Sequence, residues 1–241
     1  MYLVSNKSNP VASEETERME REWKVKFPDD YIRFLAQYGE GTYKGWLNVQ
    51  APDPDVLPPF VEYGFWEHDE TCPITEEQIG QCISIGTTID GDFLAVHPDV
   101  DGVLWLPRHS ERIAAKPAAE PDYTAFLDRI YYEAYGDAEH VPAYFEPWNA
   151  TRQHAFFHFT AEGDRRLAMH DLGQRCKERF GPDLVIENEY TGILFFQSMG
   201  GYVRFNYAYE REIAVFYEPD SGTLFDEMMQ FLKRNHCRIL T

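Results

Sequence analysis

Apolar residues recur at helical spacing near the start of the chain. Four of them fall at positions i, i+3, i+4 and i+7, which predicts a helix with one apolar face: Tyr31, Phe34, Leu35 and Tyr38. Pro28 suits the first turn of this helix, and Gly39 suits its end. An acidic helix is expected just before it, from Ser13 to Trp23, because a serine followed by glutamates favours a helix start.

The next apolar runs are short and separated by turn residues, as in antiparallel strands. Residues 83–89, 93–97 and 103–106 are predicted as a three-stranded meander. Trp46, Leu47 and Val49 predict an earlier strand, whereas the prolines of residues 51–59 favour irregular loops.

A third helix is predicted from Asp122, which can cap it, to Gly136, which can end it. Its apolar positions repeat at helical spacing and include Phe126 and Leu127. We expect the three helices to share a core that contains Trp23, Tyr31, Phe34, Leu35, Phe126 and Leu127.

The second half of the chain repeats the mixture of strands and helices. Strands are predicted at residues 155–159, 184–186, 193–197, 202–207 and 213–217, and helices at about 164–180 and 223–236. Residues 137–153 contain Pro142 and Pro147 among polar residues and are expected to form a linker. The fold class expected is therefore α+β, with a first domain at 1–136, in which helices pack on a mainly antiparallel sheet, and a second small α+β domain at 154–241.

Charge is distributed unevenly between the halves. The formal net charge is -19. Residues 1–149 hold 28 Asp and Glu against 11 Lys and Arg, or -17, and residues 150–241 hold 13 against 11, or -2. Between Gly45 and Pro107 there are twelve acidic residues and no Lys or Arg. Such a surface repels nucleic acid and anionic membranes and attracts a basic protein, although acidic surfaces also serve only to keep proteins soluble.

The candidate partner-binding residues lie in this acidic stretch. They combine carboxylates with aromatic side chains that can anchor a partner: Trp46, Asp53, Asp55, Tyr63, Trp66, Glu67, Asp69, Glu70, Asp90, Asp92, Asp99 and Asp101. For the aromatic residues, a place in the core is the alternative interpretation.

Candidates for chemistry are weak. His154 and His158 stand ~13 Å apart on a strand, which is too far for one metal ion. Glu187 and Glu189 share a strand face but are more simply a solvated edge. Asp99 and Asp101 match only part of a calcium loop, so a hairpin turn accounts for them better. We therefore predict no enzyme activity, no metal and no cofactor.

The four cysteines are scattered, which predicts reduced thiols. No apolar run reaches the roughly 18 residues of a membrane span, and the first residues lack a signal-peptide core. A cytoplasmic location is expected, and the oligomeric state is left open.

The first 135 residues resemble the SUKH superfamily of Smi/Knr-type regulators and toxin-immunity proteins. The resemblance rests on an ordered series of motifs: Phe27-Pro28-Asp29-Asp30-Tyr31, Phe34-Leu35, Tyr38-Gly39, Gly91-Asp92-Phe93-Leu94, Asp101-Gly102-Val103 and Phe126-Leu127. It implies protein binding, since many bacterial members are immunity proteins that plug toxins, often nucleases, and fungal relatives are scaffolds. The leading hypothesis is an immunity protein for a basic nuclease toxin. The alternatives are a scaffold or regulatory module, and an enzyme whose site lies in the second domain.

Overall fold

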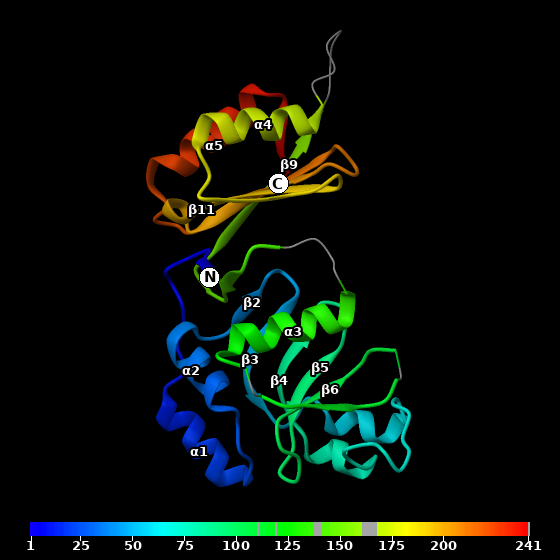
Figure 1. Cartoon of the computed structure of the whole chain (residues 1–241). Coiled ribbons are helices and arrows are strands. Elements are labelled where there is room, and N and C mark those ends of the chain that lie inside the picture. Colours follow the sequence, from blue (N-terminus) through cyan, green and yellow to red (C-terminus); the bar gives the residue numbers. More distant parts are fainter. Residues whose placement is uncertain (110, 119, 137–140, 161–167, 241) are drawn as a thin grey trace. The chain divides into compact units, whose positions relative to one another are not determined.

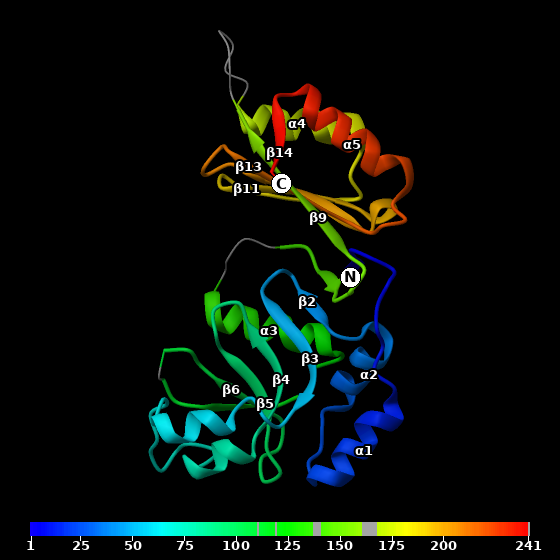
Figure 2. The same cartoon turned by 180° about the vertical axis from the view of Figure 1, so that it is seen from behind.

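The computed structural model describes residues 1–109, 111–118, 120–136, 141–160 and 168–240. The chain forms two compact units. The N-terminal unit comprises Ser8–His140 and Phe145–Trp148, and the C-terminal unit comprises Met1–Lys7, Val141–Tyr144 and Asn149–Thr241. Figure 1 and Figure 2 show both units from opposite sides. Each unit combines helices with an antiparallel sheet, so the expected α+β class is confirmed.

The described residues of the N-terminal unit form three α-helices, two 3-10 helices and seven strands. The helices are α1 (Ser13–Trp23), α2 (Asp29–Tyr38) and α3 (Tyr123–Tyr135), and two short 3-10 helices are η1 (Pro58–Tyr63) and η2 (Glu77–Gln81). The strands are β2 (Gly41–Tyr43), β3 (Leu47–Asp53), β4 (Ile83–Thr88), β5 (Phe93–Val96), β6 (Val103–Leu106), β7 (Ala114–Lys116) and β8 (Tyr144–Pro147). Their order in the sheet is β8-β2-β3-β4-β5-β6-β7.

The apolar faces of the helices pack in the core, as the spacing of apolar residues predicts. Five of the six expected core residues are at most 4% exposed, namely Tyr31, Phe34, Leu35, Phe126 and Leu127. The sixth, Trp23, is only half-buried. Asp122 caps α3 by accepting a hydrogen bond from the Ala125 N–H at 2.9 Å. Gly39 has a φ of 72°, and a Cβ there would lie 2.2 Å from the carbonyl oxygen of Asn9, so only glycine fits this helix end.

The opposite face of this sheet is covered by the segment that carries η1 and η2. Leu57, Trp66 and Ile79 from this segment form a cluster with Leu104 and Leu106 of β6. Side chains alternate along a strand, so Val103 points to the helical side and is also fully buried. The sheet is thus buried on both faces, which explains why the sequence shows continuous apolar runs there.

Residues 137–153 are not simply a linker. Within them β8 pairs with β2, with Phe145 opposite Tyr43 and Pro147 opposite Gly41. Phe145 is fully buried and meets the ring of Phe34 edge-on at 5.0 Å. The flanking prolines conceal this strand in the sequence, because proline is tolerated at the ends of strands as well as in loops. Residues 137–140 lie outside the described part of the chain.

The C-terminal unit is a six-stranded antiparallel sheet with two helices over one face (Figure 1). The strand order is β10-β11-β12-β13-β9-β14. The elements are β9 (Gln153–Phe159), α4 (Met169–Phe180), β10 (Leu184–Glu187), β11 (Thr191–Phe196), the 3-10 turn η3 (Gln197–Met199), β12 (Gly201–Asn206), β13 (Glu212–Tyr217), α5 (Gly222–Arg234) and β14 (Cys237–Leu240). The last helix was expected to reach residue 236, but it ends two residues earlier and β14 pairs with β9. The start expected for α4, near residue 164, lies outside the described residues.

The first seven residues belong to the C-terminal unit, which differs from the expected boundary at residue 136. Strand β1 (Tyr2–Leu3) bonds to residue 143, with the Tyr2 N–H donating to the Ala143 carbonyl at 2.9 Å. Glu218, only 3% exposed, accepts from the Ser5 hydroxyl at 3.2 Å and lies 3.5 Å from the Lys7 ammonium. This segment is too short to reveal its long-range partner in the sequence.

Candidate partner-binding site

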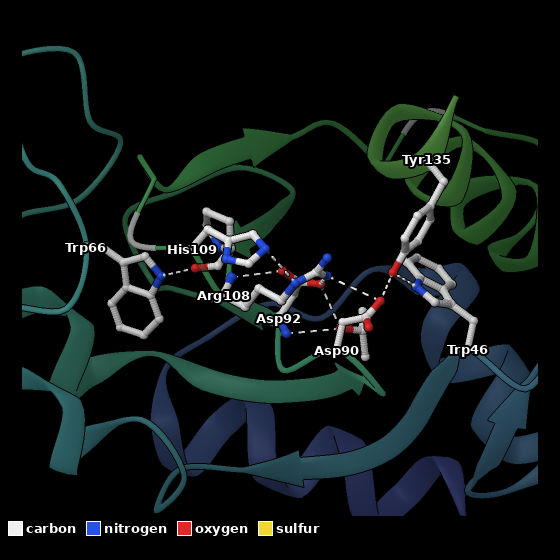
Figure 3. Close-up of polar contacts among 9 residues, drawn as sticks. Trp46, Trp66, Asp90, Asp92, Arg108, His109 and Tyr135 are labelled. Atoms are coloured by element: carbon white, nitrogen blue, oxygen red, sulfur yellow. Dashed lines mark hydrogen bonds and ion pairs between the residues drawn. The ribbon is translucent and has the colours of Figure 1, made fainter. Parts of the chain in front are cut away.

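Two of the three aromatic residues expected at a partner surface are buried. Trp46 is 4% exposed, and its indole stacks on Trp105 and donates to the Tyr135 hydroxyl at 2.9 Å (Figure 3). Trp66 is also 4% exposed and donates to the Pro107 carbonyl at 2.7 Å. Both indoles therefore belong to the core, because their faces bury apolar area there and their N–H groups have internal acceptors.

Tyr63 differs from the two tryptophans, because it lies at the end of η1 with 74% of its surface exposed. The residue after it, Gly64, has a φ of 50° and ends the 3-10 helix. Tyr63 thus remains available to a partner.

Asp92 was expected on the surface but is 3% exposed. Its carboxylate accepts from the Thr88 hydroxyl at 2.7 Å and from the Arg108 N–H at 2.8 Å, and the Arg108 guanidinium lies 3.2 Å away. A buried carboxylate needs such donors, since burial without them costs free energy. Asp92 therefore fixes the β4–β5 turn to the end of β6 and is not accessible to a partner.

Asp90 is exposed and shares the same arginine with Asp92. The Arg108 Nη1 lies 3.2 Å from the Asp90 carboxylate, and the Tyr135 hydroxyl donates to that carboxylate (Figure 3). Partial burial and the hydrogen bond to Asp90 raise the pKa of Tyr135 above its ordinary value. Asp90, Asp92, Arg108, Tyr135 and Trp46 thus form one continuous polar network.

The loop with Glu67, Asp69 and Glu70 is also partly neutralised. Asp69 accepts from the Thr71 N–H at 2.8 Å and from its hydroxyl at 2.6 Å, and it pairs with Arg112 at 2.6 Å. Hydrogen bonds from Thr71, assisted by Arg112, hold the pKa of Asp69 below its ordinary value. Glu67 and Glu70 are exposed.

Strand direction divides the expected acidic site into two ends. Leu47 lies opposite Thr88, and Phe93 lies opposite Leu106, so the β4–β5 turn and the exit from β6 share one end of the sheet. We call this the paired end, and it contains Asp69, Asp90, Asp92, Arg108 and Arg112. Strand β5 separates it from the β5–β6 turn by four residues, or roughly 13 Å.

The other end, which we call the acidic end, gathers exposed carboxylates. Asp53 lies opposite Ser84 at the start of β4, and the Gln78 side chain donates to Asp99 at 3.3 Å. The acidic end comprises Asp53, Asp55, Glu76, Glu77, Asp99 and Asp101, all exposed. Among the residues that the structure describes, no lysine or arginine forms an ion pair with these six. The lysine in register with Val103, Lys116, is bound by Glu133 at 2.6 Å.

The chemical candidates of the C-terminal unit are placed differently. His154 and His158 lie on β9, where His158 is opposite Glu212 and Arg238. Within the described ranges, no group of three or more His, Cys, Asp or Glu side chains is arranged to hold a metal ion.

Glu187 is engaged with two neighbours. It accepts from the Lys177 ammonium at 2.6 Å and from the Tyr207 hydroxyl at 2.7 Å. Burial alone would raise the pKa of Glu187, but these two hydrogen bonds outweigh it and hold the pKa below its ordinary value. Glu189 lies in the exposed turn after β10, so the two glutamates do not share a strand face as an acid and base pair.

Comparison with protein families identifies the N-terminal unit. The model of the SMI1 / KNR4 family (SUKH-1) matches residues 10–129. The chain carries a SUKH-1 domain. No curated protein and no solved structure matches the chain significantly. The matched range covers α1 to the middle of α3 and includes both ends of the SUKH sheet.

Sequence reasoning missed the cations that neutralise the paired end of the SUKH domain. Arg108 directly follows the acidic stretch, and Arg112 lies four residues further on. The signal was available for Arg108, because a hairpin between residues 93–97 and 103–106 places residue 108 near Asp92. Glu76 and Glu77 were also left out of the expected site, although they lie in the same stretch. Hydrogen bonds from its own backbone N–H and from Thr75 keep the pKa of Glu77 low, so it is ionised at neutral pH.

Proposed function

We propose that this chain is a non-catalytic binding protein of the immunity type, which binds and neutralises a basic nuclease toxin. The observation that carries the proposal is the acidic end of the SUKH domain. Six exposed carboxylates gather there, and a nuclease that binds phosphates presents a complementary positive surface. We further propose that the protein acts in the cytoplasm, in keeping with its four free thiols. No helix in the described part of the chain is long and apolar enough to cross a membrane.

The acidic end is a better docking surface than the paired end because its charge is not compensated. Asp90 and Asp92 share the single positive charge of Arg108, and Asp69 has Arg112, so two of these three negative charges are compensated at short range. The carboxylates of the acidic end keep their full charge, and their summed field steers a basic partner during association. We therefore withdraw Trp46, Trp66 and Asp92 from the proposed surface and keep Asp53, Asp55, Asp99 and Asp101 at its centre. Tyr63, Glu67 and Glu70 remain exposed candidates outside this centre.

The test uses the toxin domain encoded beside the gene for this chain. We expect the full chain to inhibit that domain, and raising salt from about 0.05 to 0.5 M should slow association at least roughly tenfold, because the Debye length falls from ~14 to ~4 Å. Neutralising the acidic end should slow association at low salt and remove much of the salt dependence. The variant carries Asp53→Asn, Asp55→Asn, Glu76→Gln, Glu77→Gln, Asp99→Asn and Asp101→Asn.

The matched control removes one charge of each sign at the paired end, with Asp69→Asn and Arg112→Gln. Its association rate should equal that of the wild type. If the variant neutralised at the acidic end associates at the wild-type rate, those carboxylates serve solubility and do not form the docking surface. Absence of a toxin gene from the neighbourhood would count against the immunity role and favour the scaffold alternative.

A further inference from the structure

A cavity of about 390 Å³ lies at the acidic end of the SUKH domain. Three separate segments line it: the connection between α1 and α2, the β5–β6 turn, and the residues after β7. Its walls mix polar and apolar groups, and the apolar ones are Phe27 and Pro28 from the first segment and Pro98 and Val100 from the second. Phe27 is fully buried, so this wall is held by the core.

Charged groups of both signs line the same cavity. Asp29 comes from the start of α2, Asp101 from the β5–β6 turn, and Lys26 from the α1–α2 connection. The Lys26 ammonium lies 3.1 Å from Glu20, which is outside the cavity lining, and 3.4 Å from Asp29, so a cation already binds one of the two carboxylates that line the cavity. Lys26 and Asp29 are both exposed, and such a pair is easily exchanged for another cation because water and salt screen it.

His97 forms a further part of the wall and is 2% exposed. Its Nδ1 accepts from the Asp99 N–H at 3.1 Å, so its Nε2 carries the hydrogen. Among the described residues, this Nε2 has no hydrogen-bond partner. Burial lowers the pKa of His97, although Asp99 opposes this, so at neutral pH the ring carries no net charge.

We propose that this cavity receives an arginine side chain of the partner. The proposal rests on the basic partner inferred above and identifies how that partner is anchored. The aliphatic part of an arginine packs on Pro98 and Val100, while the planar guanidinium binds the carboxylates of Asp29 and Asp101. The long-range field of the acidic end then governs association, and the filled cavity slows dissociation.

The probe is N-acetyl-arginine amide, and its matched control is N-acetyl-citrulline amide, which has nearly the same shape but no charge. Both are titrated into the full chain while NMR records the His97 ring and the Gly102 amide, which lie in the wall. We expect the arginine probe to shift both signals with a dissociation constant of about 1–10 mM, as suits one exposed side-chain contact. The citrulline probe should bind at least about fivefold more weakly.

Two substitutions should move the affinity in opposite directions. Asp101→Asn removes an attractive charge and should weaken arginine binding about two- to fivefold, whereas Lys26→Gln removes the resident cation and should strengthen it by a similar factor. Asp69→Asn, at the paired end, should leave it unchanged. All three residues are exposed, so circular dichroism should show a wild-type fold for each variant.

The proposal is overturned if His97 and Gly102 do not respond to the arginine probe, or if citrulline binds equally well. It is also overturned if Lys26→Gln weakens binding. These outcomes are separate from the test of the proposed function. If neutralising the acidic end slows toxin association but the arginine probe does not bind in the cavity, the arginine anchor is rejected and the proposed function stands. If the arginine probe binds in the cavity but the variant neutralised at the acidic end associates with the toxin at the wild-type rate, the acidic end is rejected as the docking surface.

Discussion

The two ends of the SUKH sheet have similar sequences of turn aspartates but different electrostatics. At the paired end, Asp90 and Asp92 share the guanidinium of Arg108, and Asp92 is buried. At the acidic end, Asp99 and Asp101 are exposed, and no described lysine or arginine pairs with them. The carboxylates of one end hold the fold together, whereas those of the other form no ion pair with a lysine or arginine that the structure describes. Counting acidic residues along a stretch therefore overstates its available charge, because the next turn can supply the cations.

The strongest test of this contrast is the loss of a carboxylate from each end. Asp92→Ala should lower the free energy of unfolding by about 1.5–3 kcal/mol, because it leaves the Thr88 hydroxyl and the Arg108 N–H without their acceptor. Asp99→Ala should change it by less than about 0.5 kcal/mol. Denaturant titration of both variants gives the comparison. Similar losses for both would mean that the two ends are not distinct.

A smaller effect is expected where the paired end joins the aromatic core. Tyr135→Phe removes the hydroxyl that accepts from Trp46 and donates to Asp90, and it should cost about 1 kcal/mol of stability. Tyr132→Phe is the matched control, because Tyr132 is 58% exposed on the same helix. Thermal unfolding followed by Trp fluorescence should show a lower midpoint for the first variant only. An unchanged midpoint for Tyr135→Phe would mean that the Tyr135 hydroxyl does not stabilise the paired end.

The smallest effect concerns the titration of Asp69. Its pKa lies below the ordinary 3.8, first because Thr71 donates to it and then because Arg112 is near. A depressed folded-state pKa gives stability that is present above pH 3.8 and is lost as the pH falls through the folded-state value. Arg112→Gln should raise the pKa partly, and Thr71→Val should raise it further. Carboxyl NMR titration measures both, and a pKa at the ordinary value in the wild type would contradict the contact geometry.

Local patterns predicted the elements of the SUKH domain with good accuracy. The apolar stripe of α2, the stop at Gly39 and the cap at Asp122 depend on residues within one or two turns of each other. The same holds for the strands β4, β5 and β6, whose runs are bounded by turn residues. Strands β1, β7, β8 and β14 were missed, because they have only two to four residues. Strands β1, β8 and β14 are also stabilised by partners far along the chain.

The candidate site was predicted in composition but not in geometry. The twelve carboxylates between Gly45 and Pro107 are visible in the sequence, yet their division into two ends depends on the direction of β5. Burial of Trp46 and Trp66 depends on packing against Trp105 and on the acceptor at Pro107. An aromatic residue flanked by acids looks the same in the sequence whether it faces a core or a partner.

The sequence by itself determined the α+β class, the helices and meander of the SUKH domain, and the excess of negative charge in the first half. These properties follow from short-range periodicity, turn chemistry and composition. Only the tertiary structure decided which carboxylates keep their charge. Strand register places Arg108 beside Asp90 and Asp92, and the fold places Arg112 beside Asp69, whereas the six carboxylates of the acidic end meet no such cation among the described residues. Electrostatic interactions depend on distance in space, and distance along the chain does not determine it.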